Sequence, residues 1–160
     1  MIFVRVAQDD PLAAPLLAGL AVEYAHRYGG DEEVHLRALH DYPADEFAPP
    51  GGGLVIGLIA GTPVTGGAFR RFGVVDGAET AELKRIWTHS RHRRHGYAAA
   101  LLREVESEIA ARGYRRIYLT TGNRQPEAEA LYESAGYRRL EAPLPAAGPV
   151  YPVAFQKALT

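Results

Sequence analysis

The sequence predicts an α/β (α+β) fold, a mixed central sheet of about six to seven strands flanked by about four helices. Short apolar runs of strand length recur along the chain, and several segments between them carry apolar residues at helical spacing. Residues 80–121 also show a strand, helix, strand order, whose crossover connection requires parallel strands. The length of 160 residues fits one domain, and we expect residues 1–160 to form it.

A strand and two helices are expected at the N-terminus. Residues 2–6 alternate apolar and other residues, which indicates a strand. An acidic pair and Pro11 then open a helix that we expect to reach Tyr28, where two glycines end it. Asp31 caps a second helix to about residue 41. The residues expected to face inward are Leu12, Leu16, Leu20 and Tyr24 in the first helix and Val34, Leu36 and Leu39 in the second.

A loop, a hairpin and a third strand are expected next. Residues 43–53 contain three prolines and three consecutive glycines, which indicates a loop, and such loops often carry substrate contacts. Residues 54–60 and 64–72 are apolar runs joined by a Gly-Thr-Pro turn, which favours an antiparallel hairpin. Residues 80–88 form the following strand.

The C-terminal half is predicted to alternate helices and strands. Residues 97–112 carry apolar residues at helical spacing, and Gly113 lies just beyond the expected end of this helix. Residues 116–121 form a buried strand, and Pro126 opens a further helix. This last helix is expected to end at residue 135, and the final strands lie near residues 137–140 and 151–157.

Composition excludes several classes of protein. Hydrophobic residues make up 47% of the chain and charged residues 23%, as in globular proteins and unlike disordered or fibrous chains. The formal net charge of -1 argues against a protein that coats nucleic acid. The absence of cysteine excludes disulfides, thiolate metal sites and a cysteine nucleophile. We find neither a secretory signal nor a run of about 18 apolar residues, so we expect a cytoplasmic protein with no membrane partner.

The most informative segment is residues 93–98, Arg-Arg-His-Gly-Tyr-Ala, between a strand that ends at Thr88 and a helix that begins near Gly96. A helix N-terminus presents unpaired N–H groups and the positive end of the helix dipole, which together form an anion site. Gly96 lets the backbone approach a phosphate closely, the small Ala98 avoids a collision, and the arginines add positive charge. The segment therefore predicts a site for a diphosphate or a sugar phosphate.

At these residues the chain resembles the GNAT superfamily of acetyltransferases, whose cofactor motif reads Gln or Arg, two residues, Gly, one residue, Gly or Ala. Arg93, Gly96 and Ala98 match this motif. Residues 82–88 are similar to the strand that precedes the motif in the family. Residues 127–137 are similar to a later helix of the family, with its Leu-Tyr pair and its Gly-aromatic ending.

The resemblance implies a GNAT fold with a splayed parallel strand pair and acetyl-CoA as co-substrate. Pantetheine would pair with the backbone of the first parallel strand like an added strand, and the turn would hold the diphosphate. A backbone N–H near Trp87 would polarise the thioester carbonyl, while the Trp87 ring is expected in the core. The residues implied to bind the cofactor are Ile86, Trp87, Thr88, Arg93, Arg94, His95, Gly96, Tyr97, Ala98 and Gln125. At Gln125 many relatives carry asparagine, so the chain departs from the family there.

Two residues are candidates for proton transfer. An amine must lose a proton before it attacks a thioester, and Glu82 stands where several members of the family place a catalytic glutamate. The alternative is a surface carboxylate paired with Lys84 or a neighbour. The departing thiolate needs a proton or a hydrogen bond, and Tyr132 matches the family position for that role. Tyr132 is at the same time a candidate core residue of its helix.

Tyr24 and Tyr28 are the candidate substrate-binding residues, because they end a helix that borders the acceptor site in this family. The simpler interpretation is that Tyr24 packs on the leucine face and Tyr28 caps it. His89, His92 and His95 lie beside arginines that would repel a cation, and the other histidines are dispersed. No metal site is therefore predicted.

The leading hypothesis is an N-acetyltransferase that transfers the acetyl group of acetyl-CoA to an amine by direct attack in a ternary complex. The alternative is a non-catalytic acyl-CoA sensor or interaction module with the same fold. A nucleic-acid patch at residues 91–95 ranks last, because it is short and lacks interleaved aromatic residues. The sequence does not identify the acceptor, a small-molecule or peptide amine, and edge strands near the C-terminus are compatible with a homodimer.

Overall fold

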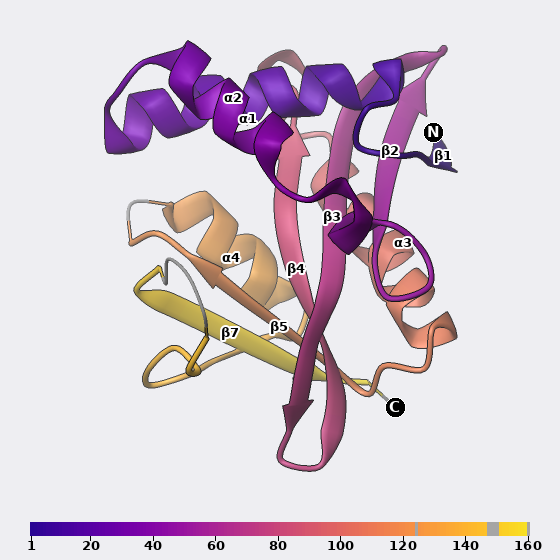
Figure 1. The fold of residues 1–160 in the computed structure, drawn as a ribbon, viewed down its shortest axis with the longest axis vertical. Helices are drawn as coiled ribbons and strands as arrows, with labels where there is room; N and C mark the ends of the chain where they lie inside the picture. The colour runs from indigo at the N-terminus through magenta and orange to yellow at the C-terminus, as the bar shows by residue number, and fades with distance from the viewer. Residues whose placement is uncertain (124, 147–150, 160) are drawn as a thin grey trace.

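The computed structural model describes residues 1–123, 125–146 and 151–159, which form one sheet with helices on both faces (Figure 1). The strands in these ranges are β1 (Ile2–Arg5), β2 (Gly53–Ile59), β3 (Thr62–Val75), β4 (Ala78–Thr88), β5 (Arg116–Thr121), β6 (Arg138–Arg139) and β7 (Val153–Ala158). The α-helices are α1 (Ala14–Tyr28), α2 (Glu32–Asp41), α3 (Tyr97–Ala111) and α4 (Pro126–Ser134). Short 3-10 helices are η1 (Pro11–Ala13), η2 (Ala44–Phe47) and η3 (Ser90–His92).

The described strands form a mixed sheet in the order β1-β2-β3-β4-β5-β7-β6. Neighbouring strands are antiparallel apart from β4 and β5, which are parallel and are connected through α3. This is the strand, helix, strand unit predicted over residues 80–121. The expected α+β architecture, with a mixed sheet and flanking helices, is confirmed.

Each face of the sheet carries its own apolar core. Leu54 and Ile56 of β2 pack in a cluster with the leucines of α1, whereas Val55 between them packs in a cluster with α3. This alternation follows from the strand geometry, in which successive side chains point to opposite faces. Helices α1 and α2 therefore cover one face, and α3 and α4 belong to the core of the other.

Asp31 caps helix α2 as predicted, and its side chain accepts a hydrogen bond from the N–H of Glu33 (2.8 Å). Its inward face differs from the prediction. Leu39 is buried, but Val34 is 66% exposed. The prediction for Val34 was wrong because residues two apart in a helix do not share a face, so Val34 cannot face inward together with Leu36.

The loop predicted over residues 43–53 contains η2, and its last residue, Gly53, already belongs to β2. Phe47 of η2 is buried, and its ring stacks on Tyr42 with centroids 5.1 Å apart. The segment is thus anchored to the core by an aromatic residue. Residues 43–53 line none of the three cavities of the candidate site described below.

The parallel strands β4 and β5 separate along their length (Figure 1). Their pairing extends from Thr80 opposite Arg116 to Glu82 opposite Tyr118, and no further within the described ranges. Strand β4 also bulges at Arg85, which has a positive φ of 60° and lies where the register with β3 shifts. The C-terminal parts of the two strands diverge, and the candidate site lies there.

Candidate active site

The turn between β4 and α3 leaves backbone N–H groups available to an anion. Gly96 is the N-cap residue of α3; it has a φ of 76° and provides no side-chain cap. The first N–H groups of a helix have no partner within it, and the bond that Ala100 N donates to Gly96 O (3.1 Å) closes the first turn. A methyl group on Gly96 would meet no atom within 4 Å. The N–H groups of Tyr97 and Ala98 belong to this first turn, at the positive end of the helix dipole.

The side chains of this turn differ in what they contact. Arg93 forms an ion pair with Glu23 of α1, and burial raises the pKa of Glu23 although Arg93 acts in the opposite direction. The His95 ring stacks on Tyr97 with centroids 5.4 Å apart, and its Nδ1 lies 2.8 Å from the carbonyl oxygen of Arg93. Arg94 is exposed. An anion at the turn would compete with Glu23 for Arg93.

A first cavity, the α4 groove, lies between β4 and α4 and has a volume of about 220 Å³. It brings together six of the residues predicted to bind the cofactor or to catalyse, namely Ile86, Thr88, Arg93, Ala98, Gln125 and Tyr132. Its other lining residues are Glu23, Arg27, Glu127, Ala128 and Leu131. The Trp87 ring does not line it, because it is buried against Gly19 of α1.

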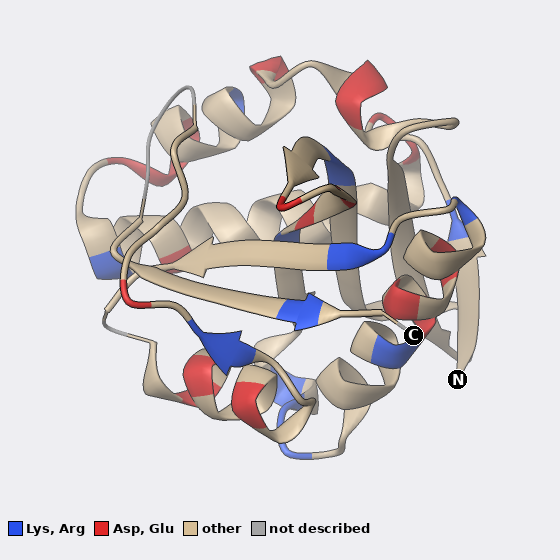
Figure 2. Ribbon diagram, turned by 90° about the horizontal axis from the view of Figure 1, so that it is seen from below, with Lys and Arg blue, Asp and Glu red and all other residues tan. Residues whose placement is uncertain are grey.

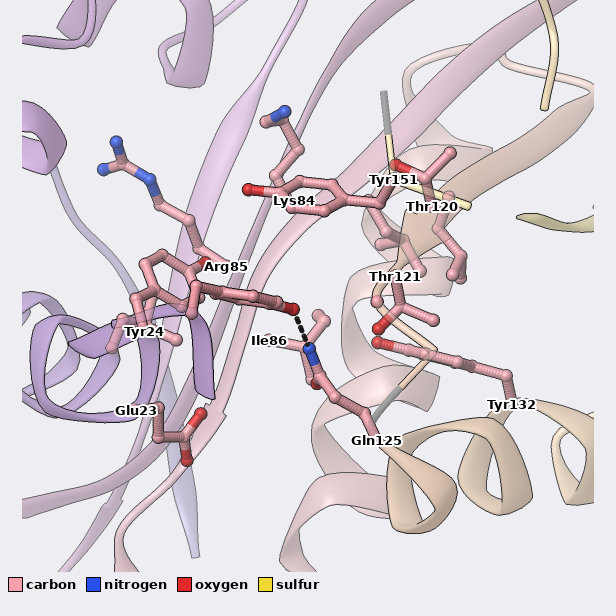
Figure 3. Close-up of a pocket in the computed structure, with 15 residues that line it drawn as sticks. Glu23, Tyr24, Lys84, Arg85, Ile86, Thr120, Thr121, Gln125, Tyr132 and Tyr151 are labelled. Carbon is pink, nitrogen blue, oxygen red and sulfur yellow. Dashed lines mark hydrogen bonds between the residues drawn. The ribbon is translucent and has the colours of Figure 1, made fainter. Parts of the chain in front are cut away.

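A second cavity of about 80 Å³, the junction cavity, lies between the diverging ends of β4 and β5. It shares Glu23, Ile86, Gln125 and Tyr132 with the α4 groove. Gln125 Nε2 donates a hydrogen bond to the Tyr28 hydroxyl (2.8 Å), the dashed line in Figure 3, and this bond links α1 to the start of α4. The two residues thus cross the space between the separated strands.

A third cavity of about 370 Å³, the α2 cavity, lies beside α2 on the other side of the junction. It shares six residues with the junction cavity, namely Tyr24, Leu83, Lys84, Arg85, Thr120 and Tyr151. The remaining lining residues are His35, Ala38, Leu39, Tyr42 and Glu82. The α4 groove, the junction cavity and the α2 cavity therefore follow one another across the opening between β4 and β5.

Glu82 lies in the wall of the α2 cavity, on β4. Its Oε1 accepts a hydrogen bond from Arg70 Nε (2.9 Å), and Arg70 NH1 also donates to Glu46 Oε1 (2.9 Å). Glu82 Oε2 has no hydrogen-bond partner among the described residues. Every side-chain oxygen or nitrogen that is fully buried in those residues does have a partner, so Oε2 is not fully buried. This oxygen is therefore accessible from the cavity. The ion-pair partner of Glu82 is Arg70 on β3, and the carboxylate is buried rather than at the surface.

Tyr132 lies where the α4 groove meets the junction cavity. Its ring is buried against Tyr137 and Phe155, with centroids 5.8 Å apart in both contacts. Its hydroxyl points toward Thr121 in Figure 3 and bonds to no described residue. Since the described residues contain no buried side-chain oxygen without a partner, this hydroxyl must be accessible from the cavity. Burial raises the pKa of Tyr132, which keeps the hydroxyl protonated and able to donate. Its roles as core residue and proton donor are compatible.

Tyr24 and Tyr28 lie on the wall of the junction cavity. Tyr24 is half-buried and also lines the α2 cavity, whereas Tyr28 is 43% exposed and covers Gly122. Burial raises the pKa of Tyr24, so its hydroxyl is a donor. Tyr24 therefore packs on helix α1 and also lies at the candidate site, so the two interpretations of this residue are compatible.

Sequence reasoning missed several residues of the α2 cavity. They are His35, Tyr42, Lys84, Arg85 and Tyr151. Lys84 had a signal, because it stands two residues after Glu82 and so shares its face of the strand. His35, one of the histidines dispersed in the sequence, is half-buried with Nε2 2.8 Å from the carbonyl oxygen of Gly29. Arg85 reaches the cavity because β4 bulges there, and no glycine or other sequence signal predicts this bulge.

The described ranges contain neither a metal-binding cluster nor a membrane-spanning helix. No group of three or more His, Asp or Glu side chains there has a metal-binding arrangement. None of the helices in those ranges combines the length and the hydropathy needed to span a bilayer.

Comparisons with known proteins agree on one family. The sequence model of the acetyltransferase (GNAT) family matches residues 17–137. N-acetyltransferase 8 of Homo sapiens is 33% identical over 85 residues, which cover 53% of this chain and 34% of that protein. N-acetyltransferase family 8 member 2 of Rattus norvegicus is 34% identical over 88 residues, which cover 55% of this chain and 36% of that protein. The matched part is thus about a third of the length of these curated relatives.

The fold comparison extends over nearly the whole chain. The crystal structure of an acetyltransferase of the GNAT family from Staphylococcus aureus matches 99% of this chain and 100% of that chain, with a TM-score of 0.76. The sequence identity is 14%, so this likeness establishes the fold alone.

Proposed function

The chain belongs to the acetyltransferase (GNAT) family, and we propose that it transfers the acetyl group of acetyl-CoA directly to an amine bound in the α2 cavity. Its family is one of N-acetyltransferase enzymes that use acetyl-CoA. The observation that carries the proposal is that the α4 groove and the α2 cavity meet at the junction cavity. Two substrates that enter from opposite sides would bring their reacting atoms together there.

The described residues fit acetyl-CoA in three ways. The N–H groups that follow Gly96 suit a diphosphate, with Arg93 as a further donor. Beyond Glu82, within the described ranges, the edge of β4 that faces β5 has no backbone partner, whereas the opposite edge pairs with β3. The edge that faces β5 at residues 86–88 could therefore pair with the amides of pantetheine. The α4 groove offers apolar contacts from Ile86, Ala128 and Leu131. Within this proposal, Trp87, Arg94, His95 and Tyr97 act through their backbone, and Gln125 through its side chain.

The proposed reaction needs two proton transfers. Acetyl-CoA supplies a thioester carbonyl carbon, which the amine nitrogen attacks, so that a C–N bond forms as the C–S bond breaks. We assign Glu82 to accept, directly or through a water, the proton that an ammonium must lose before attack. We assign Tyr132 to give a proton to the departing sulfur, and the second proton that the nitrogen loses then returns Tyr132 to its neutral form, directly or through water. Tyr24 and Tyr28 would position the acceptor at the junction.

The proposal extends to the setting of the enzyme. We take residues 1–160 as one acetyltransferase domain that works in the cytoplasm, without a metal and without a nucleic-acid partner. The net charge of -1 supports the last point, as do the acidic and basic residues interspersed over the ribbon in Figure 2. A homodimer through the sheet edge at β6 remains a proposal, and sedimentation equilibrium would test it.

Calorimetric titration with acetyl-CoA, followed by a thiol-release assay over a panel of amines, tests the proposed function. We expect saturable binding and release of one CoA thiol for each amine acetylated. Ala98→Trp would fill the α4 groove and abolish both signals, whereas Ala38→Trp would fill the α2 cavity and abolish transfer alone. Absence of binding at millimolar acetyl-CoA by the folded wild-type protein would contradict the proposal.

A further inference from the structure

Two consecutive cations of β4, Lys84 and Arg85, both line the α2 cavity and the junction cavity. In a regular strand, consecutive side chains point to opposite faces. Here the bulge at Arg85, with its φ of 60°, turns both side chains toward the same space. Figure 3 shows Lys84, Arg85 and Tyr151 around this space. The bulge thus concentrates positive charge beside the proposed reaction centre.

The carboxylates near Lys84 are already engaged. Glu82 binds Arg70, and Arg70 also binds Glu46, so these three groups form one ion-pair chain. No carboxylate in the described ranges lies within ion-pair distance of Lys84, and its Nζ lies 5.8 Å from the centroid of the Tyr42 ring. The fixed charges around the cavity therefore carry a positive excess.

Arg85 is satisfied in a different way, by neutral groups. Its guanidinium donates to Gln8 Oε1 (2.7 Å) and to the carbonyl oxygen of Leu39 (2.8 Å). It also lies over the rings of Tyr42 and Phe47, 5.2 Å and 4.8 Å from their centroids. These contacts hold Arg85 in place and leave its charge uncompensated.

Lys84 is the cation that a ligand can reach. Its ammonium has no hydrogen-bond partner among the described residues, which contain no buried unpartnered side-chain nitrogen, so Nζ must open into the cavity. Burial lowers the pKa of Lys84, and the nearby Glu82 only partly opposes this effect. A partly desolvated ammonium gains most from an anion that enters with the ligand.

We infer that the acceptor is an α-amino acid, whose free carboxylate binds Lys84 while its amine faces the thioester. This inference rests on the proposed function and names the class of its acceptor. Lys84 lines the α2 cavity, where the acceptor is proposed to bind, and also the junction cavity, so one ligand could place its carboxylate on Lys84 and its amine at the junction. Polyamines, which carry several positive charges and no carboxylate, are disfavoured by the same cations.

The aromatic wall of the cavity guides the choice of probes. Tyr24, Tyr42 and Leu39 offer apolar surface to a side chain. Phenylalanine and phenethylamine share an aromatic group and a primary amine, and differ in the carboxylate. We expect the wild-type enzyme to acetylate phenylalanine with a kcat/KM about 10- to 100-fold above that for phenethylamine.

Two variants assign this preference to Lys84. Lys84→Met removes the cation and should abolish the preference, mainly by raising KM for phenylalanine, whereas Lys84→Arg should keep it. The comparison between enzymes cancels the different nucleophilicities of the two amines. Arg103→Met, which removes an exposed cation of α3 outside the three cavities, is the control and should leave the preference unchanged.

A binding measurement separates this inference from the proposed function. With CoA present, N-acetylphenylalanine should bind the wild-type enzyme at least about 10-fold more tightly than N-acetylphenethylamine. The Lys84→Met enzyme should bind the two products with equal affinity. A wild-type enzyme that acetylates both amines equally, or a preference that survives in Lys84→Met, overturns the inference and leaves the proposed function intact. If neither amine is acetylated, equal or absent binding of the two products also overturns it. An enzyme that binds the carboxylate product through Lys84 but never consumes acetyl-CoA contradicts the proposed function instead.

Discussion

Single residues at the junction cavity carry the proposed chemistry, and Tyr132 is the first of them. Its ring is fixed in the core while its hydroxyl has no partner among the described residues. Tyr132→Phe should therefore lower kcat by about 10²-fold, with little change in KM, because only the proton donor is lost. Steady-state thiol release measures this effect. The melting temperature of Tyr132→Phe should match that of the wild type. A fully active Tyr132→Phe enzyme would exclude Tyr132 as the proton donor.

Glu82 differs from Tyr132 because it also holds an ion pair. Glu82→Gln keeps an oxygen that can accept from Arg70 but loses the capacity to take a proton. We expect kcat/KM to fall by about 10²-fold at neutral pH, and the deficit to shrink as the pH rises and the amine arrives deprotonated. A pH profile of kcat/KM checks this prediction.

Glu46 provides a matched control for Glu82. It binds the same arginine at the same 2.9 Å distance but lines none of the three cavities of the site. Glu46→Gln should leave kcat/KM within about twofold of wild type. Equal losses in the two variants would show that the ion-pair chain, and not a proton transfer at Glu82, accounts for the effect.

At the scale of elements, helix α3 offers a comparison between its own two ends. Gly96 and Gly113 flank it with φ angles of 76° and 92°, and a methyl group on either would meet no atom within 4 Å. Alanine at either position should lower the free energy of unfolding by about 1 kcal/mol, because both positions require a left-handed backbone conformation. Gly96→Ala alone should also weaken acetyl-CoA binding, since only Gly96 adjoins the proposed diphosphate site.

Denaturant unfolding and calorimetry together check this pair. We expect Gly96→Ala and Gly113→Ala to lose the same amount of stability, and only Gly96→Ala to lose affinity for acetyl-CoA. If Gly113→Ala weakens acetyl-CoA binding to the same degree, the effect comes from the helix as a whole, and the assignment of the diphosphate to its N-terminus fails.

The elements were also the part of the molecule that the sequence predicted best. Apolar periodicity and the glycines and prolines at the ends locate α1, α3, α4 and the β2–β3 hairpin, because these signals are local. Val34 was misplaced because α2 is short and its apolar residues do not repeat regularly. The bulge at Arg85 was missed because a positive φ at a residue other than glycine depends on tertiary packing.

The site was predictable only in part, for a similar reason. Residues 93–98 and Tyr132 belong to motifs that are continuous in sequence, and the assignment of their functions remains a prediction. The α2 cavity combines α1, α2, β4, β5 and Tyr151, which are far apart in sequence and meet only through the fold. No local pattern could reveal that Lys84 and Arg85 share a cavity or that Glu82 is held by Arg70.

For the molecule as a whole, an ion-pair chain ties the first strand to α3. Glu108 accepts hydrogen bonds from Arg5 and from Arg112, and Arg112 also donates to the carbonyl oxygens of Pro50 and Gly52. Burial acts to raise the pKa of Glu108, but the bonds from Arg5 and Arg112 outweigh it and lower the pKa overall. The Glu108 carboxylate therefore stabilises the fold above the unfolded-state pKa, and this stabilisation is lost as the pH falls through the folded-state value.

Thermal denaturation between neutral and acidic pH tests this contribution. Glu108→Gln should melt below the wild type at neutral pH, and the difference between the two proteins should narrow as the pH falls below about 4.3, the ordinary glutamate pKa. Glu141→Gln is the control, because exposed Glu141 has no recorded partner in the described ranges. A difference between Glu108→Gln and wild type that is constant with pH would contradict the electrostatic account.

The central claim is that acetyl-CoA lies along the α4 groove, with its diphosphate at the N-terminus of α3 and its thioester at the junction of the three cavities. A crystal structure of the protein with acetyl-CoA tests it most directly. We predict the diphosphate oxygens within hydrogen-bond distance of the N–H groups of Tyr97 and Ala98, and the thioester sulfur beside the Tyr132 hydroxyl. A bound cofactor that left the turn at Gly96 empty, or whose thioester lay outside the junction, would contradict the account.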